Sequence, residues 1–129
     1  MREYDMRRGE TLDERAPDLV ALIERYFGPV TGTEAYEGQE LHVVEEPDNP
    51  AFERIVAGAV RYSGRKDRLA VHFEERDPAE LLATGAIEAA ADAVQAKNDF
   101  LQEVTGRDAK SRRESLKRAV EDEPDDANV

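Results

Sequence analysis

Three runs of strand-forming residues in the middle of the chain constrain its fold more than any other feature. Residues 40–46 (ELHVVEE), 52–63 (FERIVAGAVRYS) and 68–75 (RLAVHFEE) are rich in Val, Ile, Phe and Tyr, which favour extended structure. The polar stretch EEPDNP separates the first two runs, and GRKD is short enough to be a hairpin connection between the last two. The middle of the chain therefore predicts an antiparallel sheet.

Apolar and other residues alternate in the third of these runs, which predicts one buried and one wet face. The positions expected to face the core are Leu69, Val71 and Phe73. The positions expected to face water are Arg68, Ala70, His72 and Glu74. Two weaker candidates add to the sheet: REYDMRR near the start as a short strand, and VTGTEAYEG at 30–38 as either a fourth strand or a loop.

Helical patterns flank the predicted sheet. Between 17 and 27, apolar residues fall at the spacing of one helical face, with Pro17 and Asp18 suited to the first turn and Gly28 to the end. After Pro78, the segment PAELLATG predicts a short helix or turn. Residues 86–106 then predict a helix about 30 Å long, which Gly106 would end.

A further helix is expected from 109 to about 121, capped by Asp108. The sequence thus predicts a single α+β domain at 1–121, in which 107–121 form a basic amphipathic helix. Its sheet would be three- or four-stranded and antiparallel, with an N-terminal helix and long C-terminal helices packed on one face. Residues 122–129 are acidic and poor in apolar residues, so we expect a disordered tail there.

The charge of the chain indicates its solvent rather than its partner. The formal net charge is -12, from 30 acids and 18 bases, and only four of the bases are lysine. Such a composition is found in disordered chains, but the periodic apolar segments argue against disorder. Adaptation to molar intracellular salt explains it better, because dense carboxylates keep a protein surface hydrated. The chain has no cysteine, no apolar run long enough to span a membrane and no signal-peptide pattern, so we expect a cytoplasmic protein.

The stretch RDAKSRRESLKR at 107–118 stands out against this acidity, because it holds six bases and two acids. Two smaller basic patches lie at 7–8 and 65–68. Together these could track phosphates, or their arginines could pair with carboxylates at close range. On a helical wheel, Arg112 alone of the six bases points to the apolar side. The residues predicted to contact a partner or phosphate are Arg107, Lys110, Arg112, Arg113, Lys117, Arg118, Arg65, Lys66 and Arg68.

Enzyme chemistry has little support in the sequence. His42 and His72 each lie in a predicted strand that is followed by paired glutamates, but a whole strand would separate them. The serines lack a nucleophile elbow, and the glycines lack the spacing of a phosphate loop. We therefore expect no catalytic residue, no metal and no cofactor.

The long helix carries apolar residues every seven positions, which resembles a coiled-coil seam over less than three heptads. Because a small acidic domain has a modest core, we expect the chain to form a homodimer that buries the apolar residues of the long helix left over from the core. The predicted subunit-interface residues are Ile87, Val94, Leu101, Leu116 and Val120.

Several short segments of the sequence resemble those of a family of small uncharacterised proteins from halophilic archaea. They are MRRGE at 6–10, YFG at 26–28, RIVAG at 54–58, YSGRKD at 62–67, and AKNDFL with TGRDAKSRRESLKR at 96–118. The resemblance covers nearly the full length and implies a cytoplasmic protein of a high-salt cell, but it implies no activity, cofactor or site residue.

Two hypotheses about function remain after this comparison. The first is a non-enzymatic structural or interaction protein, expected to be homodimeric. The alternative is a nucleic-acid-binding accessory protein that uses the basic patches 7–8, 65–68 and 107–118. Molar salt shortens the Debye length to about 3 Å and weakens counterion release, which favours arginine–carboxylate contacts over phosphate tracking.

Overall fold

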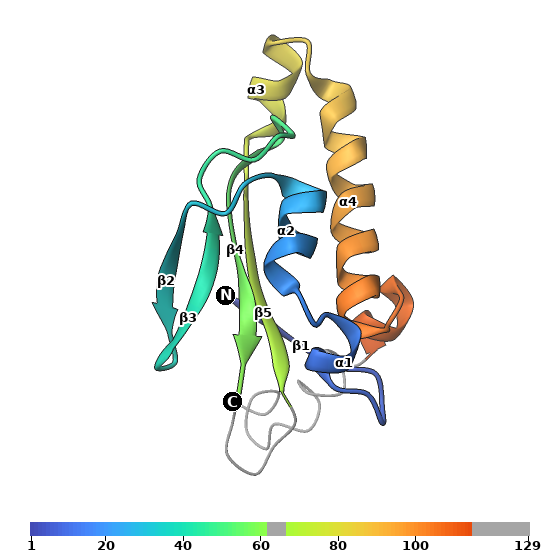
Figure 1. Ribbon diagram of the computed structural model, residues 1–129. Coiled ribbons are helices and arrows are strands. Elements are labelled where there is room, and N and C mark those ends of the chain that lie inside the picture. Colours follow the sequence, from blue (N-terminus) through green and yellow to red (C-terminus); the bar gives the residue numbers. More distant parts are fainter. Residues whose placement is uncertain (62–66, 115–129) are drawn as a thin grey trace, which may run out of the picture.

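The computed structural model describes residues 1–61 and 67–114. An antiparallel sheet carries helices α2 (Leu19–Phe27) and α4 (Ile87–Thr105) along one of its faces (Figure 1). The α+β class predicted from the sequence is confirmed. The hairpin residues Arg65 and Lys66, the second half of the predicted basic helix and the predicted tail at 122–129 lie outside the described residues.

The sheet has five strands, where three or four were expected. They are β1 (Arg2–Asp5), β2 (Gly32–Tyr36), β3 (Gln39–Val44), β4 (Phe52–Val60) and β5 (Arg68–Glu75), in the order β1-β5-β4-β3-β2. The two strands that were weak candidates form the two edges. Their sequences, REYD and GTEAY, lack a buried apolar stripe, so their pairing comes from backbone contacts that side-chain patterning does not indicate.

The helices begin and end close to the predicted positions. The expected helix at 17–27 is α2 (Leu19–Phe27), whose N-terminus is capped by the Asp18 carboxylate, which accepts from the Ala21 N–H at 3.0 Å. A short helix that was not expected, α1 (Leu12–Arg15), precedes it. The later segments form α3 (Pro78–Ala83) and α4 (Ile87–Thr105). Gly106 ends α4 in the left-handed conformation, with φ of 76°, as the sequence predicts.

Aromatic rings fill the main core between the sheet and the helices. Phe27 of α2 lies 5.7 Å from Phe52 of β4 and 5.1 Å from Phe100 of α4, measured between ring centroids. All three rings are at most 1% exposed. Leu101 and Val104 also join this core, so the last turns of α4 are held tightly against the sheet.

A second, smaller apolar cluster covers the opposite face of the sheet, which the alternation in β5 had marked as wet. The buried members of this cluster are Leu41, Val43, Val56, Val60 and Ala70. The expectation that Ala70 faces water is therefore wrong, because Ala70 is 0% exposed. Tyr36 of β2 packs over this cluster and shields it from solvent.

The sheet is curled so strongly that side chains of its two edge strands meet beside this second cluster. The Tyr36 hydroxyl on β2 donates a hydrogen bond of 2.5 Å to Glu3 on β1. In a flat sheet these outermost strands would be about 19 Å apart, four strand spacings. The curl explains how one small domain buries apolar side chains on both faces of a single sheet.

Candidate anion-binding cleft

A cleft of about 500 Å³ opens where the two ends of the described chain come together. Its walls are the start of the chain with β1, the outer part of β5, the second half of α4 and the helical residues 109–114. The lining residues are Met1, Arg2, Tyr4, Val71, His72, Phe73, Glu75, Lys97, Asn98, Leu101, Ala109, Arg112 and Arg113.

The wall at 109–114 is positioned by the turn that follows α4. Asp108 caps the new helix as predicted, since its carboxylate accepts from the Ser111 N–H at 2.8 Å. The Arg107 side chain folds back and donates to the Met6 carbonyl at 3.2 Å. The Arg7 N–H donates to the Thr105 carbonyl at 2.7 Å, so the turn is fixed to the residues that follow β1.

Arg112 is the distinctive residue of the cleft. It is only 5% exposed, and its guanidinium donates to the Arg107 carbonyl at 2.6 Å and to Asn98 Oδ1 at 3.0 Å. Both acceptors are neutral, and no carboxylate of residues 1–61 or 67–114 forms an ion pair with it. Burial lowers the pKa of Arg112 below the ordinary arginine value, because removal from water disfavours the charged form.

Other cations of the cleft reinforce this charge. Arg2 and Arg113 are exposed and line the opening. Lys97 forms an ion pair with Glu75, and its ammonium lies 5.7 Å from the centre of the Phe73 ring. The lining therefore holds three arginines and one lysine against a single carboxylate, although the whole chain carries -12.

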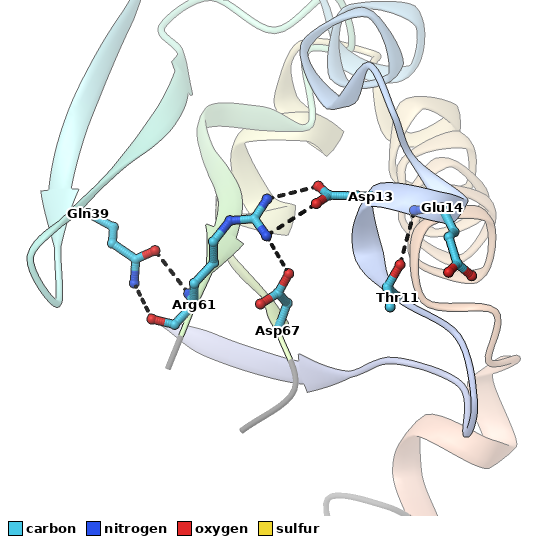
Figure 2. Close-up of polar contacts among 6 residues, drawn as sticks. All are labelled: Thr11, Asp13, Glu14, Gln39, Arg61 and Asp67. Atoms are coloured by element: carbon cyan, nitrogen blue, oxygen red, sulfur yellow. Dashed lines mark hydrogen bonds and ion pairs between the residues drawn. The ribbon is translucent and has the colours of Figure 1, made fainter. Parts of the chain in front are cut away.

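In the part of the chain that the structure describes, six arginines outside the cleft form ion pairs with carboxylates, which Arg112 does not: Arg15, Arg25, Arg54, Arg61, Arg68 and Arg76. Figure 2 shows Arg61 held between Asp13 of α1, at 2.8 Å, and Asp67, at 2.6 Å. The Gln39 side chain also pairs with the Arg61 backbone in both directions, at 2.9 and 3.2 Å. On the far face of the sheet, Arg54 lies within 3.5 Å of three glutamates.

The remaining residues predicted to contact a partner or phosphate are dispersed. Arg107 is half-buried by its bond to Met6, and Lys110 is exposed but does not line the cleft. Arg68 pairs with Asp5 at 3.0 Å. The other four, Arg65, Lys66, Lys117 and Arg118, lie outside the described residues.

Three residues that were not predicted as site residues also line the cleft. Arg2, Asn98 and Lys97 line it, and of these only Lys97 gave a signal, as a charge interrupting the apolar stripe of the long helix. Arg2 could not be assigned, because its position depends on β1 pairing with the distant β5.

The two histidines do not converge on a site. His42 pairs in register with Ala57 of the main core, whereas His72 pairs with Val56 of the second cluster. Their side chains therefore project from opposite faces of the sheet. Within the described residues, no group of three or more histidine and acidic side chains is arranged to hold a metal ion.

The predicted seam along α4 is divided between surface and core. Ile87 and Val94 are 47% and 53% exposed, but Leu101 is 5% exposed and belongs to the main core. Leu101 is therefore occupied by intrachain packing and has no surface to offer a second subunit. The other two predicted interface residues, Leu116 and Val120, lie outside the described residues.

Comparison with known proteins gives a family but no activity. A family model described as a domain of unknown function matches residues 1–118. No curated protein and no solved structure matches the chain significantly. Among the helices that the structure describes, none is long and apolar enough to cross a membrane.

Proposed function

The chain belongs to the family Domain of unknown function (DUF5611), and from the geometry of the cleft we propose that it is a non-enzymatic binding protein for an anionic partner. The observation that carries the proposal is the buried Arg112, whose charge faces neutral acceptors at the wall of the cleft. A buried cation that forms no ion pair is costly. Among the described residues, the charge of Asp108 attracts Arg112 but forms no ion pair with it. An anion bound beside Arg112 would form one.

The surroundings of Arg112 support the same function. An arginine presents five N–H donors, and two of its donors meet acceptors within the described part of the chain. Arg2 and Arg113 at the opening add positive charge that a bound anion would neutralise. The volume of about 500 Å³ falls in the range typical of ligand sites.

The solvent in which this binding takes place is part of the proposal. An excess of 30 acids over 18 bases keeps a surface hydrated in molar salt, so we place the protein in the cytoplasm of a salt-adapted archaeal cell. Long-range attraction is screened there. Binding then depends on direct contact with the guanidinium groups, which a cleft lined by three arginines provides.

The proposal is tested by titrating the labelled full chain with tripolyphosphate and following its amide resonances in a KCl series that ends at molar concentration. We expect the shifts to concentrate at residues 97–98 and 109–113. Arg113→Gln should weaken binding about tenfold, the effect of losing a charge-assisted contact of roughly 1.4 kcal/mol. Lys110→Gln is the matched control, because it removes the same charge from the same helix outside the cleft. Absence of shifts, or equal losses in the two variants, would refute the cleft as the site.

A second candidate function is homodimerisation through the exposed apolar side chains of α3 and α4. Leu82 of α3 and Ile87 and Val94 of α4 are 68%, 47% and 53% exposed, and Figure 1 shows α3 beside the start of α4. Light scattering at molar KCl tests the dimer. Val94→Glu should convert a dimer to a monomer, whereas a wild-type monomer across micromolar concentrations would contradict this candidate.

Nucleic-acid binding stays as the alternative occupant of the basic surface. The observation in its favour is that the patch at 7–8 adjoins the start of the 107–118 stretch, through the bond from Arg7 to Thr105. Binding of an RNA oligomer across a salt series, with loss in Arg8→Gln as well as Arg113→Gln, would support it.

A further inference from the structure

We propose that the anionic partner is an extended acidic segment of a polypeptide, which adds to the open edge of β5 and places carboxylates against the cations of the cleft. This inference rests on the proposed function, because it names the partner of the same cleft. It adds a backbone component to the recognition, which tripolyphosphate cannot use.

The outer edge of β5 is only half covered by its neighbouring strand. β1 pairs with β5 over four residues, from Arg2 opposite Val71 to Asp5 opposite Arg68. β5 itself continues to Glu75 and stays paired on its other side with β4. On the β1 side, no strand of the described chain pairs with residues 72–75. Such an edge offers backbone N–H and C=O groups to an added strand.

The cleft follows this same uncovered edge. Val71, His72, Phe73 and Glu75 all line it, although successive side chains of a strand point to opposite faces. Val71 and Phe73 face the helices, and His72 between them also lines the cleft, so the cleft follows the course of β5 along this edge. A peptide in the cleft would therefore lie beside the backbone of β5, in line with β1.

The cations are placed on one side of such a peptide. Lys97 and Arg112 come from the helical layer, and Arg113 and Arg2 stand at its opening. In an extended peptide every second side chain would point toward this layer. The site should therefore prefer acidic residues at alternate positions, and tolerate other residues at the positions between them.

A nucleic acid finds fewer complementary groups in the cleft than an acidic peptide does. Single-stranded nucleic acids gain much of their affinity from bases stacked on aromatic rings. The Phe73 ring is already covered by the Lys97 ammonium, and Tyr4 is only partly exposed. The backbone groups along residues 72–75 would serve a peptide strand, whereas they give a stacked base no particular partner.

The test compares three fluorescent probes by anisotropy, with the full chain in molar KCl. The first is a peptide of alternating Glu and Val. The second is the same peptide with alternate backbone nitrogens methylated, so that its carboxylates are kept but its N–H donors toward β5 are lost; both methylation frames are made. The third is a single-stranded RNA of similar charge.

We expect the unmodified peptide to bind best, and one methylation frame to weaken its binding at least tenfold. Arg113→Gln should lower peptide affinity about tenfold, with Lys110→Gln close to wild type. Equal binding of the peptide and both methylated frames would overturn the strand-addition proposal. Preference for the RNA would overturn the peptide while leaving an anion-binding cleft. If tripolyphosphate also fails to bind, the proposed function itself is wrong.

Discussion

Gly58 in the middle of β4 should tolerate no side chain. A Cβ built there would lie 2.7 Å from Leu41 Cδ2 and 3.1 Å from Leu41 Cα on the neighbouring strand β3. Leu41 is 0% exposed within the second apolar cluster, so its side chain has nowhere to retreat and its Cα can shift only with the strand.

The size of the effect follows from two opposing contributions. Overpacking of a buried site costs about 1–3 kcal/mol. Replacing glycine stabilises by about 0.4–1 kcal/mol, because the unfolded chain loses conformational freedom. At the middle of these ranges, roughly 2 and 0.7 kcal/mol, the Gly58→Ala variant should lose about 1.3 kcal/mol in its free energy of unfolding.

Urea unfolding at fixed KCl concentration measures this change. Gly32→Ala is the matched control, because it also lies in a strand but has nothing within 4 Å of its Cβ; it should gain about 0.4–1 kcal/mol. Adding Leu41→Val removes the clashing Cδ2, so a double-mutant cycle should show favourable coupling between the two sites. If Gly58→Ala is as stable as wild type, the close packing of β3 against β4 described above is wrong.

Three further perturbations follow from single contacts. Asp18→Ala removes the cap of α2 and should cost about 1 kcal/mol by the same urea assay. The hydrogen bond and charge of Arg61 lower the pKa of Asp13. The ionised Asp13 therefore stabilises the fold fully above the ordinary carboxyl pKa, and this stabilisation is lost as pH falls through the lowered pKa of the folded state. Asp13→Asn should accordingly flatten the acid side of a curve of unfolding free energy against pH. The hydrogen bond to Glu103 raises the pKa of Tyr26. The stabilisation that this bond gives the fold is therefore present below the usual tyrosine pKa of about 10, and it is lost as pH rises through the raised pKa of the folded state. Tyrosinate absorbance should therefore show a late-titrating group that Tyr26→Phe removes.

The elements that were predicted well are those whose side chains carry a periodic pattern. The strands at 52–63 and 68–75 alternate or run apolar, and the helix ending at Phe27 has a clear apolar face. The edge strands were only weakly predicted, because β1 and β2 have polar sequences and are held in the sheet by pairing with β5 and β3. The burial of Ala70 was not predicted for a related reason: it belongs to the second apolar cluster, whose other buried members come from β3 and β4.

The candidate site was predicted only in part. The helical wheel placed Arg112 on the apolar side of its helix, and its 5% exposure agrees with that position. No pattern in the sequence indicates that Arg112 lines the same cleft as the edge of β5 and Arg2, which is separated from it by most of the chain. Leu101 shows the opposite failure, because its seven-residue spacing predicted a subunit seam although the main core uses it.

The pairing of β1 with β5, and the hydrogen bonds that join residues 6–7 to the turn after α4, have a consequence for synthesis on the ribosome. Residues 2–5 are translated well before their partner strand, which begins only at Arg68, and translation at about 5–20 residues per second delays that strand by several seconds. Met6 and Arg7 wait still longer, for Arg107 and Thr105. Residues 2–7 are thus fixed long after they are made, and a nascent chain has no cleft until residues 109–113 have been translated.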